Sequence, residues 1–427
     1  MFVKLLPGIS LMLFSAVMAI ALSVGLPAVS EASGAQTEQA PSDDISALTY
    51  GNTSLALDLY KELKEEKGNL FFSPLSVSTA VAMTYAGADG QAAKAIEDVF
   101  RFPTKGEELH QSFELLTKKL ETSDDADDEA SDDAGDGPLF TLANSLWPQK
   151  DSEILQSFFD VINQYYGSRI FPVDYRNNEP QAREDINEWV AEATRDKILN
   201  FLPSPVSNST TLILINAVYF KGKWESPFNP ELTIEGDFQA ESGPIKAQFM
   251  NAKDHFNYFE STELQAIELP YAGEDLSMVI LLPANEQSTL TDLENSLNSE
   301  KLQSIVNGLA FAEVELSLPR FSLTWGTTSL RPALEKLGLG PAFGPNADYS
   351  KMTADSSNYL SDVLHKAFVE VNEEGTEAAA ATGGMVRATA MELKPTIFKA
   401  DHPFIFLIQE KSTNSLLFIG RLAAPAE

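Results

Sequence analysis

The chain has 427 residues, of which 44% are hydrophobic and 10% aromatic, enough to bury one large core or two ordinary ones. Thirty basic and 62 acidic residues give a formal net charge of −32, which disfavours binding to nucleic acid or to anionic lipid surfaces. Because the chain contains no cysteine, thiolate catalysis and cysteine-based zinc sites are excluded.

The N-terminal segment has the layout of a secretory signal peptide. Lys4 precedes an apolar run over residues 9–29, and small residues follow it. We predict a signal peptide over residues 1–33, and the alternative is a retained membrane anchor because the apolar run is long. After removal of this segment, the protein is expected to be secreted or periplasmic and not attached to a membrane. Export without disulfides favours a bacterial source.

The next segments are a linker and two helices. Residues 34–46 are small and polar, which is typical of a linker, and residues 47–64 have a helical pattern. The sequence NLFFSP at residues 69–74 predicts a turn that leads into a second, apolar helix ending near Ala86.

An acidic segment interrupts the chain at residues 121–137. It carries nine carboxylates and no basic residue, so we predict a solvated insertion on the surface that does not fold by itself. Calcium binding is the alternative, but Ala134 and Ala143 occupy ligand positions of an EF-hand loop counted from Asp132. No metal site is therefore predicted.

Beyond the insertion, mixed helices come first and strands come later, which is typical of an α+β fold. Helices are predicted over residues 152–166, 183–199, 291–309 and 330–337, and a central buried strand over residues 211–220. Further strands are predicted from the sequences PLFTLANSLW, LQAIELPY, LSMVILLPA, VELSLPRFSL, FIFLIQ and SLLFIGRL.

Motifs of catalysis are missing. No GxSxG, HExxH, P-loop or GxGxxG sequence occurs, and GLGPAFG at residues 338–344 has the spacing of a helix cap and turn. A triad could still be assembled in space around one of the four histidines. The missing motifs nevertheless favour a protein that is not an enzyme and that uses no cofactor.

Five motifs occur in an order that resembles the serpin family. They are NLFFSPLSVSTAVAMTYAGA, INAVYFKGKWESPF, LSLPRFSL, LHKAFVEVNEEGTEAAAA and ADHPFIFLIQ. The resemblance implies a serpin domain over residues 47–427 with the insertion inside it. It also implies an α+β serpin fold with three β-sheets, eight or nine helices and an exposed reactive-centre loop.

The resemblance further implies two polar or aromatic sites in the main sheet. Ser73, Ser76, Asn216 and His365 match the family's shutter, where the central strands must part. Trp224 matches the family's tryptophan at the breach, the top of the same sheet. Read from the residues alone, His365 could be an ordinary buried histidine and Trp224 an ordinary core aromatic.

The resemblance also implies a hinge and a reactive bond. The hinge, which enters the sheet first, matches Glu373, Gly375, Thr376, Ala378, Ala379, Ala380 and Ala381. Family spacing puts the reactive bond at Thr389–Ala390, with Arg387–Ala388 as the alternative. Gly383 and Gly384 depart from the β-branched residues that are common in the loops of inhibitory serpins.

The implied function is inhibition of a serine endopeptidase by a monomeric suicide substrate, which traps the acyl-enzyme by inserting its cleaved loop. Small residues at the bond favour an elastase-like or subtilisin-like target, and cleavage after Arg387 would favour a trypsin-like one. The alternative is a non-inhibitory serpin that acts as a chaperone, carrier or storage protein.

Overall fold

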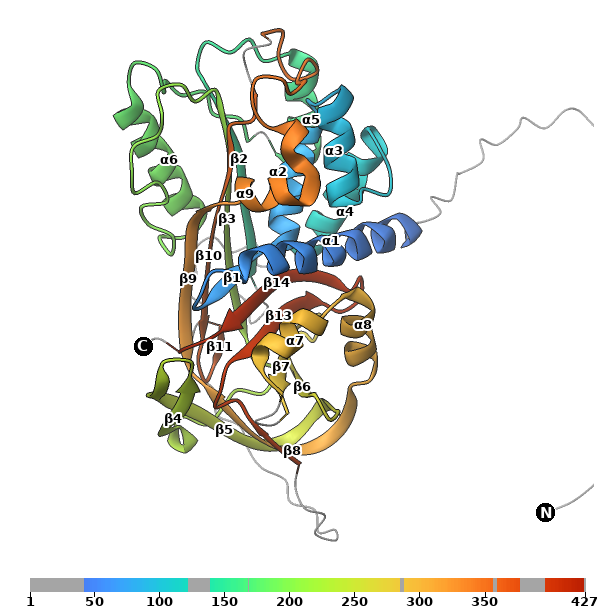
Figure 1. Cartoon of the computed structure of the whole chain (residues 1–427), viewed down its shortest axis with the longest axis vertical. Coiled ribbons are helices and arrows are strands. Elements are labelled where there is room, and N and C mark those ends of the chain that lie inside the picture. Colours follow the sequence, from blue (N-terminus) through green and yellow to red (C-terminus); the bar gives the residue numbers. More distant parts are fainter. Residues whose placement is uncertain are drawn as a thin grey trace, which may run out of the picture. The chain divides into compact units, whose positions relative to one another are not determined.

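The computed structural model describes residues 42–121, 139–167, 169–284, 288–355, 359–376 and 396–425 (Figure 1). The predicted signal peptide, most of the linker and nearly all of the acidic insertion lie outside the described residues. So do Ala378, Ala379, Ala380 and Ala381 of the hinge, and both candidate reactive bonds, Thr389–Ala390 and Arg387–Ala388.

Four helices occupy the N-terminal part: α1 (Ser42–Leu63), α2 (Pro74–Tyr85), α3 (Gly90–Phe100) and α4 (Glu107–Glu121). Helix α1 begins at Ser42, so the polar segment before it is shorter than the predicted linker, which extended to residue 46. Helix α2 is buried along its whole length, as its apolar sequence predicts, and Ser73 caps its first turn ahead of Pro74.

The later helices differ from their predicted bounds: α5 (Gln156–Tyr166), α6 (Glu179–Ala193), α7 (Leu290–Ser296), α8 (Ser299–Asn307) and α9 (Arg331–Leu334). The predicted helix over 183–199 was shifted, because the chain leaves helical geometry at Arg195 and Asp196, which have positive φ. The single helix predicted over 291–309 is two helices, because Asn298 caps α8 and interrupts the run. The described residues contain nine α-helices, within the expected range.

The main sheet has five strands: β2 (Leu139–Pro148), β3 (Leu212–Lys223), β10 (Asp362–Val371), β9 (Phe321–Ser329) and β11 (Gly375–Thr376). Strands β3 and β10 are parallel neighbours, whereas β2 and β9 pair antiparallel on either side of them. One face of this sheet packs on α2 and the main core, and the other packs on α6, a division that Figure 1 shows.

The other strands form one nine-stranded sheet: β1 (Leu70–Phe72), β4 (Ile234–Ala240), β5 (Gly243–Glu260), β6 (Leu264–Pro270), β7 (Leu276–Pro283), β8 (Ala310–Pro319), β12 (Thr396–Lys399), β13 (Phe404–Glu410) and β14 (Ser415–Leu422). Three sheets in total were expected. The 18-residue strand β5 pairs with β4, β8 and β6 in turn, so hydrogen bonds through β5 join two of the expected sheets.

The strand predicted from VELSLPRFSL is also two strands. Strand β8 ends at Pro319 in the nine-stranded sheet, and β9 begins at Phe321 in the main sheet, so Arg320 lies at the corner between the sheets. Within the described residues, no helix is long and apolar enough to cross a membrane.

Candidate functional site

The parallel pair β3 and β10 forms a seam in the main sheet. Residues 213–219 of β3 pair with residues 362–368 of β10. Beyond this stretch the short strand β11 pairs with the end of β3, where Gly375 lies opposite Lys223 and Thr376 opposite Gly222. The pairing of β11 is antiparallel. The first two residues of a strand added to β3 are therefore already in place at the end of the seam.

A tight turn over residues 372–375 directs the chain from β10 into β11. The side-chain oxygen of Asn372 accepts hydrogen bonds from the N–H groups of Glu374 (3.1 Å) and Gly375 (3.3 Å). Gly375 has a φ of 147°, and a Cβ atom at this position would lie 2.1 Å from the carbonyl oxygen of Gly222. Only glycine allows β11 to approach β3 so closely.

Trp224 fastens this turn to the end of β3. Its indole is almost fully buried, stacks on Tyr271 with ring centroids 4.7 Å apart, and donates a hydrogen bond of 2.9 Å to the carbonyl oxygen of Asn372. The backbone N–H of Trp224 donates to the carbonyl oxygen of Glu374 at 2.8 Å. The predicted breach residue thus contacts the chain at the place where β11 begins.

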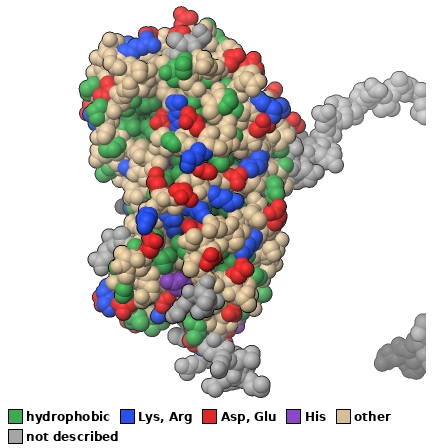
Figure 2. Space-filling model, viewed as in Figure 1, with side chains coloured by type: hydrophobic (Ala, Val, Ile, Leu, Met, Phe, Trp, Pro, Cys, Tyr) green, Lys and Arg blue, Asp and Glu red, His purple; other side chains and the backbone are tan. Residues whose placement is uncertain are grey.

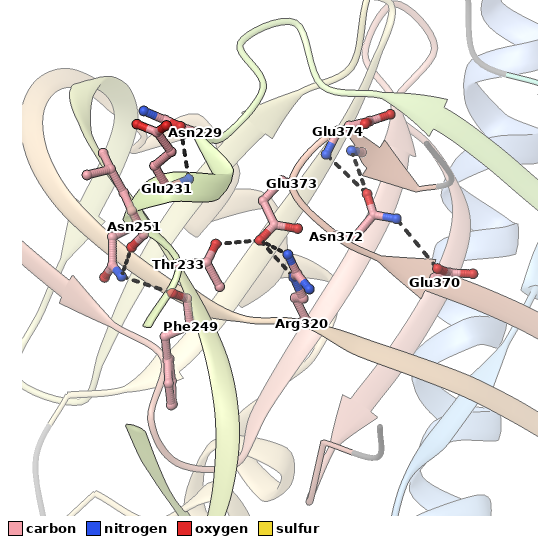
Figure 3. A network of polar contacts seen from close by, with 12 residues as sticks. Asn229, Glu231, Thr233, Phe249, Asn251, Arg320, Glu370, Asn372, Glu373 and Glu374 are labelled. Atoms are coloured by element: carbon pink, nitrogen blue, oxygen red, sulfur yellow. Dashed lines mark hydrogen bonds and ion pairs between the residues drawn. The ribbon is translucent and has the colours of Figure 1, made fainter. Parts of the chain in front are cut away.

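Glu373 carries the main polar network at this end of the sheet (Figure 3). Its buried carboxylate accepts hydrogen bonds from Nε of Arg320 at 2.7 Å, from a second nitrogen of the same guanidinium and from the hydroxyl of Thr233. Burial by itself would raise the pKa of Glu373, but the hydrogen bonds from Arg320 and Thr233 outweigh it and lower the pKa below its ordinary value. Glu373 is thereby tied to the residue just before β4 and to the corner between β8 and β9.

The four predicted shutter residues lie together in the middle of the seam. His365 and Asn216 are opposite each other across β10 and β3, and the imidazole Nδ1 is hydrogen-bonded to the amide oxygen of Asn216. The amide nitrogen of Asn216 donates to the hydroxyl of Ser76 at 2.6 Å, and the N–H of Ser73 donates to Nε2 of His365 at 3.3 Å. All four residues are buried. Side chains therefore hold the two parallel strands together and fasten them to α2.

The imidazole of His365 is neutral at physiological pH. Complete burial lowers its pKa to about 3, and no acidic side chain compensates for the lost hydration. Because Nε2 accepts from a backbone N–H, the proton of the ring is on Nδ1 and is donated to Asn216. Protonation of Nε2 would break the bond to Ser73.

Sequence reasoning missed several residues of these networks, among them Asn144, Arg320, Asn372 and Thr233. Asn144 of β2 lies opposite Asn216 and bonds to Ser76, and an asparagine inside the apolar run PLFTLANSLW was a usable signal. Arg320 bonds to Glu373, which only the folded sheet brings near it. Asn372 bonds to backbone atoms of a turn that no sequence pattern indicates. No cluster of three or more potential metal ligands occurs among the described residues.

Three comparisons agree on the family. Residues 50–425 match the family model described as serpin (serine protease inhibitor). The human leukocyte elastase inhibitor is 39% identical over 391 residues, covering 88% of this chain and 99% of that protein. A serpin-like protein of Thermococcus kodakarensis is 35% identical, covering 88% of this chain and 85% of the relative. These relatives come from an animal and an archaeon and give no support to a bacterial source.

Solved serpin structures have the same fold. Uncleaved ovalbumin superposes with a TM-score of 0.77 at 28% identity, covering 89% of this chain and all of that one. Native tengpin, a thermophilic serpin, gives a TM-score of 0.77 at 29% identity, covering 88% of this chain and 94% of that one. The expected serpin fold is confirmed, and the chain belongs to the serpin family.

Proposed function

We propose that the protein inhibits serine endopeptidases as a suicide substrate whose cleaved loop inserts into the seam between β3 and β10. The observation that carries this proposal is the pairing of Gly375 and Thr376 with the end of β3. A strand that continues in this direction would run antiparallel to both β3 and β10 and would supply each with hydrogen bonds.

The protease carries out the first chemical step, before the loop moves. Its serine hydroxyl attacks the carbonyl carbon of the residue before the reactive bond, which forms an ester and releases the amine of the following residue. Hydrolysis of this ester would free the protease. Insertion of residues 376–389 into the seam carries the ester-bound protease along the sheet before water completes the cycle. The serpin therefore turns over no substrate and acts as no enzyme.

The reactive bond is Thr389–Ala390 in this proposal. The small residues Ala388, Thr389 and Ala390 suit the shallow pocket of an elastase-like or subtilisin-like protease. A relative named leukocyte elastase inhibitor supports the elastase-like class. Mass spectrometry of the C-terminal fragment released on denaturing the complex identifies the bond: a fragment that starts at Ala390 is expected, and one that starts at Ala388 would shift the bond to Arg387 and favour a trypsin-like target.

One gel distinguishes inhibition from a non-inhibitory carrier, chaperone or storage role. Incubation with elastase-like and subtilisin-like proteases is expected to give a covalent band that survives denaturant. Cleavage of the loop without such a band, by every protease tried, would favour the non-inhibitory alternative.

The N-terminal segment supports export of the protein. Lys4 followed by the apolar run and small residues has the order of a signal peptide. N-terminal sequencing of the protein recovered outside the cytoplasm tests this: a start between residues 31 and 35 is expected, and a start at Met1 in the membrane fraction would favour the retained anchor.

A further inference from the structure

Strand β4 runs beside both ends of the loop that a protease must reach. Just before β4, the hydroxyl of Thr233 is bonded to Glu373, at the root where the loop leaves the sheet. Near the other end of β4, the N–H of Gln239 donates to the carbonyl oxygen of Asp401 at 2.7 Å, just after β12, where the loop has rejoined the fold. The residues on both sides of the loop are therefore bonded to β4 or to the residue just before it.

Hydrogen bonds hold the backbone of residues 231–232, which lead into β4. The side chain of Asn229 accepts a hydrogen bond from the N–H of Glu231 at 3.0 Å, and the amide of Asn251 donates to the carbonyl oxygen of Leu232 at 2.8 Å (Figure 3). Phe238 anchors the strand in the core. The backbone of this segment is consequently held in place before any partner arrives, which lowers the entropy cost of binding.

The exposed side chains of this segment combine apolar and acidic character. Leu232 and Ile234 are 48% and 61% exposed, and Glu231 and Glu235 beside them are exposed too. Neither glutamate forms an ion pair with a described residue, although Lys246, which is paired with Asp237 at 2.8 Å, also interacts electrostatically with Glu235 over a longer distance. Figure 2 shows hydrophobic, acidic and basic side chains together at the lower left of the surface.

Strand β4 also has an edge that is largely unpaired. Among the described strands it pairs only with β5, and on its second side Gln239 alone is bonded to the chain after β12. An exposed edge with two large aliphatic side chains between unpaired carboxylates fits a partner whose surface is apolar at its centre and basic around it. The net charge of −32 favours cationic partners in general, and this edge lies beside both flanks of the loop.

We propose that the surface formed by Glu231, Leu232, Ile234 and Glu235 is a second contact site for the target protease, which binds proteases with a basic surface beside the active-site cleft. This inference rests on the proposed inhibitory function. Charge at β4 and the residues of the reactive bond would together determine which proteases form the encounter complex.

The test measures binding separately from inhibition. A basic elastase-like protease, inactivated by replacing its catalytic serine with alanine, is titrated with the full-length mature serpin at about 50 mM and about 1 M salt. Glu231→Lys/Glu235→Lys is expected to raise the dissociation constant roughly tenfold at low salt and hardly at all at high salt. Leu232→Ser/Ile234→Ser is expected to raise it at both salt concentrations.

The control is Glu153→Lys/Asp160→Lys, which changes the net charge equally at exposed positions near the opposite end of the main sheet. It should change the dissociation constant less than twofold. Equal effects of the two charge reversals, or no effect of either, would overturn the proposal. With active protease, the glutamate variant should retain the wild-type stoichiometry of inhibition. The outcomes for the two proposals are distinguishable. If the β4 variants weaken binding but the wild-type serpin forms no covalent complex with active protease, the contact site is supported and the inhibitory function is refuted.

Discussion

Glu373 and Glu374 are neighbours in the sequence with opposite environments. The Glu373 carboxylate accepts hydrogen bonds from Arg320 and Thr233, whereas one carboxylate oxygen of Glu374 is buried without a hydrogen-bond partner in the described fold. Removing a bonded buried charge costs stability, and neutralising an unsatisfied one does not. The two residues therefore form a matched pair.

We predict that Glu373→Gln lowers the free energy of unfolding by about 1–3 kcal/mol, because Arg320 loses its ionic partner and the hinge root is released. Glu374→Gln should change it by less than about 0.5 kcal/mol or stabilise slightly. Urea unfolding of the uncleaved protein measures both changes. Equal losses in the two variants would mean that the network around Glu373 does not fasten the hinge.

His365 makes the stability of the uncleaved protein depend on pH. Its pKa is about 3 in the folded protein and about 6.5 when unfolded, so the unfolded state binds more protons between these values. The stabilisation from the neutral His365 is complete above pH 6.5 and is lost as the pH falls toward 3, on the order of 5 kcal/mol in total. His110, whose pKa burial lowers to about 4, adds a smaller loss in the same direction.

Urea midpoints measured from pH 7 to pH 4 test this assignment. His365→Gln should give a shallower decrease than the wild-type protein, with the remaining slope due to His110 and to carboxylates such as Glu373 whose pKa is lowered by folding. His110→Gln is the comparison and should reduce the slope by less than His365→Gln does. Parallel curves for His365→Gln and the wild-type protein would contradict the role given to His365.

At the scale of an element, the hinge is proposed to become a strand. Strand β11 sets the register, so Thr376, Ala378 and Ala380 would turn toward one face of the sheet and Glu377 toward the other. The register pairs Thr376 with Gly222 of β3, and even-numbered neighbours of Gly222 on β3, such as Phe220 and Val218, belong to the main core. A charge at residue 376, 378 or 380 would therefore be buried without a partner.

We predict that Thr376→Arg and Ala380→Glu convert the inhibitor into a substrate. Burying a charge without its hydration costs roughly several kcal/mol. Even about 1.4 kcal/mol added to the insertion barrier slows insertion tenfold. The measurement is the number of moles of serpin consumed per mole of protease inactivated. Glu377→Arg is the control and should be much milder. Unchanged stoichiometry in both variants would show that the hinge does not insert.

The elements show why local patterns predicted some segments and not others. Strands β7 and β14 were predicted because each is a continuous apolar run that is buried on both faces. Helices α3 and α4 were not predicted, although Ala92, Ile96 and Val99 have the spacing of a helix. The β4–β5 hairpin was missed because both strands have exposed, polar faces and β5 changes partner along its length.

At the scale of the whole molecule, contacts between distant residues decide the site. The motifs contained Ser73, Ser76, Asn216 and His365, but only the parallel register of β3 and β10 brings Asn216 and His365 opposite each other. Arg320 and Glu373 are 53 residues apart in sequence and meet because β8 and β9 turn between two sheets. Long-range pairing of this kind leaves no local pattern, so sequence reasoning from residue types alone could not predict these bonds.

The central claim is that the seam between β3 and β10 lacks one strand, which the cleaved loop supplies. Differential scanning calorimetry of the intact protein and of protein cleaved within the loop tests this claim most directly. Insertion adds a full set of backbone hydrogen bonds and buried side chains to the middle of the main sheet, so the cleaved protein should melt at a markedly higher temperature. Identical melting temperatures of the intact and cleaved proteins would contradict it.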